Sequence, residues 1–568
     1  MGIRGLKTFV NEHFTAWKTV ILRGELIIDG YSLLHSLYNE SREERQYGGD
    51  YVNFSRYVEQ FLVTLKRCGI NPFVVFDGID SDGTKKITHA KRRLEGAYTA
   101  RGILTESDPN ARIAPYLSKL VMIETVARVL GKDRLCVADG DADSYIAYLG
   151  SIRKCPILSD DSDFFVFHLS SGYIPYYTFQ WRKGQVEARV FFYKNFIKQM
   201  NIKDATLLIL LPAILGNDVL PSLDDIVRKM IRREFYRIDA IVRYISCFSN
   251  LGEAKKQMSQ VSPNALQSIK VAYRSYYGAV DGFRSNPEHR TALRNYYKGN
   301  SELPSYLVER FRIGEMPQLL MDALCLSDVE HSVTLEDTDG AWCHMISEPI
   351  RKVIYGTLCG KDAIVFEHRR HHGKMEFYLE KVHAIHVPGN DRVYLESISS
   401  CSLVDKKQIL FSALGCKEDD FSAFVHEFSN FASDLVILLA ITRFWYKAED
   451  VMDDKQKLLS AFLLTLIKML SNPPHPSKAA VKNSSYPLPR FVHAFAQWQS
   501  VYHDTYCLNK LLLEPVKLFN VSSFFTSAVI YQYVSAITQS GINEVMLQCN
   551  FSAHKSLFDT LFECVVHV

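Results

Sequence analysis

The stretch Pro72-Phe-Val-Val-Phe-Asp77 is a short apolar run that ends in an aspartate. Short runs rich in β-branched and aromatic residues are typical of buried strands. Three other runs have the same character: Glu25-Leu-Ile-Ile-Asp29, Arg134-Leu-Cys-Val137 and Cys155-Pro-Ile-Leu-Ser159. Residues 52–66, 113–130 and 205–215 have the apolar spacing of amphipathic helices. This alternation predicts an α/β fold, with a parallel sheet covered by helices on both faces.

From about residue 228 the pattern changes to long helical segments, of which 435–447, 453–470 and 491–513 are the clearest. A β-leaning island lies between residues 363 and 395, and residues 471–489 are rich in proline and serine. We therefore expect three parts. They are an α/β domain over 1–225, a mostly helical region over 226–470 with the island near 363–395, and a helical C-terminal region over 490–568 after the linker 471–489.

Composition excludes several classes of protein. The 66 basic and 63 acidic residues leave a net charge of +3, so bulk charge does not indicate a nucleic-acid partner. The 12 cysteines form no Cys-x-x-Cys pair, which argues against a zinc site or a disulfide scaffold and favours a reducing compartment. No apolar run reaches the roughly 20 residues of a membrane span. We expect a soluble intracellular protein with no membrane contact.

Aspartates recur at the ends of the predicted elements in the first part of the chain. In an open parallel sheet the carboxyl ends of the strands border one crevice, so these side chains are expected to gather there. Crowded carboxylates need a counter-charge. Mg²⁺ or Mn²⁺ is favoured over zinc because no paired histidines lie nearby. Each aspartate alone is better explained as a turn or helix-capping residue than as a ligand. The candidate ligands are Asp29, Asp77, Asp141, Asp143, Asp161, Asp163 and Asp218.

Six blocks, in order, resemble the flap endonuclease and xeroderma pigmentosum group G (XPG) superfamily of nucleases. They are Met1-Gly-Ile-Arg-Gly-Leu6, Ile27-Ile-Asp29, Phe76-Asp-Gly78, Asp141-Ala-Asp143, Ser159-Asp-Asp-Ser-Asp163 and Leu215-Gly-Asn-Asp218. A narrower resemblance over nearly the whole chain is to the asteroid homologs, a divergent branch of that superfamily. It is carried by Asp29-Gly-Tyr-Ser-Leu-Leu-His35, Tyr47-Gly-Gly-Asp-Tyr51, Phe179-Gln-Trp-Arg182, Pro349-Ile-Arg-Lys-Val-Ile-Tyr-Gly356 and Phe495-Ala-Gln-Trp-Gln-Ser500.

The resemblance implies a flap-endonuclease-type, PIN-like nuclease domain that hydrolyses DNA phosphodiesters with two Mg²⁺ or Mn²⁺ ions on the seven aspartates. It implies a nuclear protein of DNA repair; without it, a cytoplasmic address is equally open. It also suggests catalytic roles for the amine of Gly2 and for basic residues that polarise the scissile phosphate: Lys85 or Lys86, and Lys91 or Arg92.

Three departures from the family limit what is carried over. Glutamates usually stand at the positions of Asp141 and Asp143, and the segment between Asp77 and Asp141 is short for a flap-threading arch. The glycine-rich DNA-gripping motif that follows Asp218 in relatives is absent. We therefore expect single-stranded, overhang or flap DNA as substrate, without fixed polarity. A catalytically weak scaffold that binds DNA or a signalling partner, and a nuclease acting on RNA, remain as alternatives.

Three other features have simpler readings. Asp139 is a spare carboxylate that we interpret as a turn residue. His368-Arg-Arg-His-His372 lacks ligand spacing and is expected to be an exposed loop. Trp445 and Trp498 lie in apolar helical stretches and are expected in the core.

Overall fold

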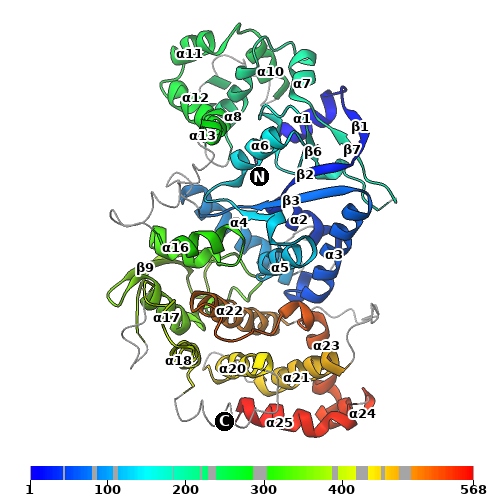
Figure 1. Cartoon of the computed structure of the whole chain (residues 1–568), viewed down its shortest axis with the longest axis vertical. Helices are drawn as coiled ribbons and strands as arrows, with labels where there is room; N and C mark the ends of the chain where they lie inside the picture. Colours follow the sequence, from blue (N-terminus) through cyan, green and yellow to red (C-terminus); the bar gives the residue numbers. More distant parts are fainter. Residues whose placement is uncertain are drawn as a thin grey trace.

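The computed structural model describes most of the chain (Figure 1). The described residues are 2–41, 45–79, 86–105, 113–182, 184–217, 220–224, 226–227, 238–285, 303–386, 395–416, 433–448, 454–471, 488–549 and 551–566. Every absence stated below refers to these residues.

A five-stranded parallel sheet forms the centre of the N-terminal half, as the sequence predicts. Its strand order is β4-β3-β2-β5-β6. Four of the strands lie at the expected positions, and β6 was not expected. The bounds are β2 (Gly24–Asp29), β3 (Ile70–Phe76), β4 (Leu135–Val137), β5 (Ile157–Ser159) and β6 (Tyr173–Pro175).

Successive residues of the central strands alternate between two hydrophobic cores. Ile28 and Val74 belong to one core, and Ile27 and Val75 belong to the other. Because side chains of a strand point alternately to opposite faces, both faces of this sheet are buried. That is why the strands read as continuous apolar runs.

One face is covered by helices of the first 130 residues together with the C-terminal half of the chain. The predicted helix 113–130 begins later, at α5. The helices that pack on this face are α2 (Gly30–Ser41), α3 (Tyr51–Arg67) and α5 (Ser118–Leu130), whereas α4 (Lys86–Leu104) packs in a separate small core with Leu335 and Val492.

The other face is covered by α1, α6 and a group of helices that Figure 1 shows in green at the top. The predicted helix 205–215 is a 3₁₀ turn, Ala205–Ile209, followed by α8. The bounds are α1 (Leu6–His13), α6 (Ala142–Arg153), α7 (Tyr193–Gln199), α8 (Leu210–Leu215), α10 (Ile238–Ser246), α11 (Leu251–Ser259), α12 (Ala265–Tyr273), a π-helical turn η7 (Arg274–Gly278) and α13 (Ala279–Ser285). A small antiparallel pair, β1 (Lys18–Ile21) with β7 (Glu187–Val190), lies beside it.

The C-terminal half stacks helices in layers below the sheet in Figure 1. The expected β island is a three-stranded sheet in the order β10-β9-β8. The bounds are α15 (Ser305–Arg312), α16 (Gln318–Leu326), β8 (Asp328–Glu330), α17 (Glu348–Cys359), β9 (Ile364–Arg370), β10 (Phe377–His383), α18 (Leu403–Ala413), α20 (Ser433–Lys447), α21 (Lys455–Ser471), α22 (Pro489–Leu511), α23 (Ser527–Ser540), α24 (Ile542–Gln548) and α25 (Lys555–Val566).

Some smaller expectations are settled by the structure. Trp445 and Trp498 are buried, as expected. The reading of 368–372 as an exposed loop is wrong for its first three residues. They belong to β9, where Arg369 and Arg370 are buried because Glu367 and Glu336 neutralise them. None of the 12 cysteines, all described, is in a disulfide. No described helix is long and apolar enough to cross a membrane.

Candidate active site

The order of the sheet strands reverses between β2 and β5. The chain that follows β2 runs to one side of this pair, and the chain that follows β5 runs to the other. In open parallel sheets, ligands bind outside the carboxyl ends of the strands at such a point. Asp29 is the last residue of β2, and Asp161 lies just beyond the end of β5. Asp77 directly follows β3 on the other side of β2. The fold therefore delivers three of the predicted ligands to one edge.

Asp29 is held at the centre of this edge. Its carboxylate accepts hydrogen bonds from the Ser32 amide (3.1 Å) and the Ser159 hydroxyl (2.6 Å). Burial and the charge of Asp77 raise the pKa of Asp29 to about 7, although these two hydrogen bonds favour the anion. This carboxyl is therefore only partly ionised near neutral pH.

The N-terminus of α6 positions three carboxylates. The Ala142 amide donates to Asp77 Oδ1 (2.8 Å), and the Asp143 amide donates to Asp141 Oδ1 (3.0 Å), so Asp141 caps the helix. Burial raises the pKa of Asp143 well above its usual range, and the charges of Asp141, Asp161, Asp29 and Asp163 add to the shift. Asp141 therefore caps the helix and is also one of the clustered carboxylates.

Asp161 and Asp163 form the opposite side of the cluster. The Asp163 amide donates to Asp161 Oδ1 (3.0 Å), and Tyr173 donates to the Asp161 carbonyl (2.8 Å). Asp163 Oδ2 accepts hydrogen bonds from Tyr276 (2.8 Å) and Asn217 (3.3 Å). Tyr276 lies in the π-helical turn η7, a type of turn that is frequent at functional sites.

Gly2 packs directly against this pair. Its φ is +83°, and a Cβ built there would overlap Asp161 Oδ1 and Ser162 Oγ. The structure therefore brings Gly2 to the carboxylates, as the resemblance suggested, and only glycine fits.

Some predicted residues are not tested. Asp218 and Lys85 lie outside the described residues, and Lys86, Lys91 and Arg92 lie in a part of α4 whose side chains are not described. Asp139 is buried and makes a bidentate ion pair with Arg312 of α15 (2.8 and 2.7 Å). It is therefore an anchor for the C-terminal half as well as a residue of a turn.

Sequence reasoning missed Ser159, Tyr276 and Lys119. Lys119 lies in the first turn of α5 and donates to Gln318 Oε1 (2.6 Å), while Gln318 donates to the Gly78 carbonyl (2.8 Å). Burial lowers the pKa of Lys119 to about 8, and the charges of Asp77 and Asp322 oppose that shift. Ser159 had a signal, since it precedes the aspartates, whereas Tyr276 and Lys119 are distant in sequence and had none.

The donor chemistry of the cluster suits a hard divalent cation. All its groups are carboxylate oxygens, and burial together with their mutual repulsion raises the pKa values of Asp29 and Asp143. Among the described residues, however, no group of three or more His, Cys, Asp or Glu side chains is arranged to hold a metal ion. The residues thus fit such an ion in kind, and their role as ligands stays a prediction.

Family comparisons agree with this architecture. Residues 1–97 match the XPG N-terminal domain, residues 118–268 match the family described as XPG domain containing, and residues 449–568 match the Asteroid N-terminal domain. These matches span both the sheet and the helices at the C-terminal end.

Relatives with full-length similarity are known. The mouse protein named single-strand DNA endonuclease ASTE1 is 26% identical, over 99% of this chain and 90% of the relative, and the human protein of that name is 25% identical over the same shares. The Drosophila protein asteroid is 32% identical over 31% of this chain and 20% of the relative. A solved Rad2 catalytic core with DNA covers 51% of this chain at 17% identity and a TM-score of 0.32, too low to place its DNA here. The chain is a member of the XPG superfamily and belongs to its asteroid branch.

Proposed function

We propose that the chain is a metal-dependent, structure-specific endonuclease that cuts single-stranded, overhang or flap DNA, and that it acts in DNA repair in the nucleus. One observation carries the proposal. Six carboxylates gather where the strand order reverses, and the pKa values of Asp29 and Asp143 rise because these groups are buried among like charges. Such crowding destabilises a fold unless a cation offsets it. The names of the mouse and human relatives support DNA as substrate.

In this proposal the metal ligands are Asp29, Asp77, Asp141, Asp143, Asp161, Asp163 and Asp218. A bound pair of Mg²⁺ or Mn²⁺ ions would supply the counter-charge and the activation of water that phosphodiester hydrolysis requires. The protein's part is to hold the oxygens. Ser32 and Ser159 orient Asp29, and Tyr276 and Asn217 orient Asp163. Partners of this kind typically change metal affinity or activity by about 10- to 100-fold.

The other parts of the chain have proposed roles too. The amine of Gly2, if Met1 is removed, would lie beside Asp161 and contact the scissile phosphate or a ligand. Lys85, Lys86, Lys91 and Arg92 would polarise that phosphate. We keep the division into 1–225, 226–470 and 490–568 as a proposal, with the helical parts covering the sheet and bordering the DNA path.

A second candidate function is a catalytically weak scaffold that binds DNA or a signalling partner. It is favoured by one observation, namely that among the described residues no three His, Cys, Asp or Glu side chains are arranged to hold a metal ion. It also agrees with aspartates at 141 and 143, whose side chains are one methylene shorter than the family's glutamates.

Cleavage of labelled DNA separates the two functions. The panel would contain single strands, duplex, both overhangs and both flaps, with matched RNA, in Mg²⁺, in Mn²⁺ and in EDTA. The test variant is Asp161→Asn. The matched control is Asp160→Asn, because Asp160 is the adjacent residue and forms its ion pair with Lys7 (2.6 Å).

We expect metal-dependent cutting by the wild type and by Asp160→Asn, and background cutting by Asp161→Asn. Equal cutting by Asp161→Asn, or cutting in EDTA, would contradict the endonuclease. A folded protein that binds DNA and cuts none of these substrates would support the scaffold. Faster cutting of the matched RNA would identify RNA, and not DNA, as the main substrate.

A further inference from the structure

A cavity of about 600 Å³ lies beside the carboxylate edge, between α5 of the N-terminal half and α16, β8 and α22 of the C-terminal half. Tyr31 and Lys119 line it. The charge of Asp77 acts on both residues, so the cavity lies close to that candidate ligand. Its volume is that of pockets that enclose a small organic molecule.

The lining combines flat aromatic surfaces with polar groups. Three tyrosines line it, from the first turn of α2, from the turn before α5, and from α22; they are Tyr31, Tyr116 and Tyr506. Lys119 lies with its ammonium 4.5 Å from the centre of the Tyr31 ring. Aromatic faces with a nearby cation are what proteins use to bind unpaired bases and their phosphates.

Arg93 and His331 are buried side chains on this lining, and each has a nitrogen atom without a hydrogen-bond partner among the described residues. Arg93 is 5% exposed and His331 is 6% exposed. Arg93 makes an ion pair with Glu330 (2.8 Å), yet its Nε has no hydrogen-bond partner among the described residues, and neither has His331 Nε2. Buried polar atoms are nearly always satisfied, so these two point to a ligand with polar edges.

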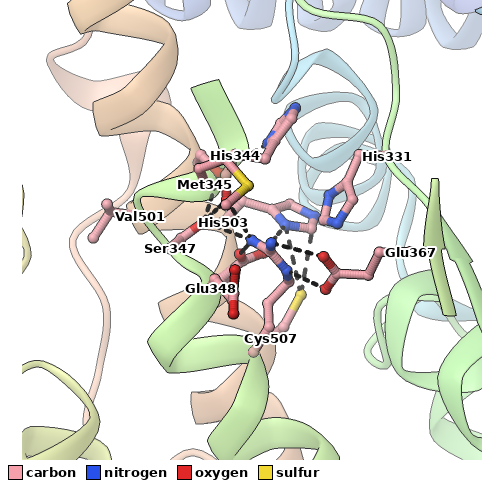
Figure 2. Close-up of polar contacts among 12 residues, drawn as sticks. His331, His344, Met345, Ser347, Glu348, Glu367, Val501, His503 and Cys507 are labelled. Atoms are coloured by element: carbon pink, nitrogen blue, oxygen red, sulfur yellow. Dashed lines mark hydrogen bonds and ion pairs between the residues drawn. The ribbon is translucent and has the colours of Figure 1, made fainter. Parts of the chain in front are cut away.

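The back wall of the cavity borders a buried network of ion pairs. Figure 2 shows His331, His503 and Glu367 converging on one buried cluster. His503 contacts Asp504 Oδ1 (3.0 Å), and the guanidinium of Arg351 bonds both Asp504 (2.9 Å) and Glu367 (2.7 and 3.0 Å). Burial alone would raise the pKa of Glu367, but Arg351 lowers it to about 2.

The Arg351 charge holds the pKa values of Glu367 and Asp504 below their usual range, so this cluster stays charged at neutral pH. Burial also lowers the pKa of His331 to about 3, so its ring is neutral at physiological pH. A neutral imidazole can donate or accept a hydrogen bond with Nε2, as the edge of a base requires.

We propose that this cavity receives one unpaired base of the DNA strand next to the phosphate being cut, and that Lys119 contacts the strand at its mouth. The inference rests on the proposed function for the identity of the ligand as DNA. Removing a paired base from a duplex costs free energy, because stacking and pairing are lost. Such a cavity therefore favours single-stranded or overhang DNA over duplex. A free deoxynucleoside monophosphate shares the chemistry and is tested separately.

Binding measured without metal tests the proposal independently of cutting. Fluorescence anisotropy in EDTA would give the Kd for duplexes with a 5′ or a 3′ overhang. The junction between duplex and overhang fixes the position of the DNA on the protein, so each overhang nucleotide has a defined place. In each set a single abasic site replaces one overhang nucleotide at a time. Deoxyadenosine monophosphate alone is the second ligand.

The test variant is Ser332→Trp, because Ser332 lines the cavity from an exposed position where an indole can fill the space without disturbing a core. The matched control is Ser399→Trp, an exposed serine that does not line the cavity. Near-ultraviolet circular dichroism would confirm that both variants fold.

Loss of one stacked base weakens binding by about 5- to 150-fold. We expect a loss in this range at one abasic position and less than about 2-fold elsewhere. Ser399→Trp keeps this profile, and Ser332→Trp abolishes it. A flat profile in the wild type, a position-specific loss that survives Ser332→Trp, or tight binding of the monophosphate with a flat profile would each overturn the inference.

Failure of the proposed function looks different. A flat profile together with metal-dependent cutting of the same DNAs would remove the base pocket and leave the endonuclease. A position-specific loss without cutting in Mg²⁺ or Mn²⁺ would keep the pocket on a DNA-binding scaffold.

Discussion

Replacing Asp29 by asparagine should stabilise the metal-free protein at high pH. Burial and Asp77 raise the pKa of Asp29 from 3.8 to about 7. A raised folded-state pKa means that the folded protein binds this proton more tightly than the unfolded chain does. The contribution of this carboxyl to stability is therefore fully present below about pH 4 and is lost as the pH rises through about 7. Above that pH the charge costs up to about 4 kcal/mol.

Asparagine keeps the shape and can still accept from the Ser32 amide, but it carries no charge. Urea unfolding of the wild type and Asp29→Asn in EDTA, from pH 4 to pH 8, measures the difference. We expect stability to be nearly equal at pH 4, with an advantage for the variant that grows to a few kcal/mol at pH 8. Mg²⁺ should stabilise only the wild type.

The matched control is Asp133→Asn, which removes a carboxylate whose side chain is 83% exposed and should change stability by less than about 0.5 kcal/mol at every pH. A variant that is less stable than the wild type at pH 8, or an advantage that does not change with pH, would refute the crowding of like charges around Asp29.

Three further substitutions test other contacts. Gly2→Ala places a methyl group against Asp161 Oδ1, so cutting should fall to background; unchanged kcat would contradict the packing of Gly2 on the site. Tyr276→Phe removes the hydrogen bond to Asp163, and metal affinity measured by calorimetry should fall about 10-fold, with Tyr273→Phe, which is half exposed, as control. Arg312→Ala leaves Asp139 buried without its bidentate partner and should cost roughly 1.5–3 kcal/mol in urea unfolding; a loss below 0.5 kcal/mol would argue against this anchor.

The sheet was predictable because its strands are buried on both faces. A run such as Phe73–Phe76 needs no partner to be recognised, and its aspartate marks where the strand ends. The short strands β1 and β7 were missed because β1 is mostly exposed, β7 is only half buried, and the two pair over a long sequence distance. Register over such distances has no local signal.

The acidic part of the site was also predictable, since each aspartate lies next to a recognisable element. The residues that tune it were not. Tyr276 reaches Asp163 from a π-helical turn, and Lys119 reaches the edge from the start of α5. Neither position has a pattern of its own, and only the packing of helices on opposite sides of the sheet brings them to the carboxylates.

The charged stretch His368–His372 shows the opposite error. A run of cations suggested exposure, because burying a charge is costly unless it is paired. Its partners, Glu336 and Glu367, are acidic residues of the same buried region. One acid is more than 30 residues away in sequence, so the pairing could not be read from the run itself.

Binding of Mn²⁺ measured by titration calorimetry tests the central claim most directly, because it does not depend on the choice of DNA. The proteins are the wild type, Asp29→Asn, Asp161→Asn and the control Asp160→Asn, titrated at pH 8. The account predicts two bound ions in the wild type and the control, and weaker or fewer ions in the other two. Equal binding by all four proteins, or no binding by any, would contradict a metal site on these carboxylates.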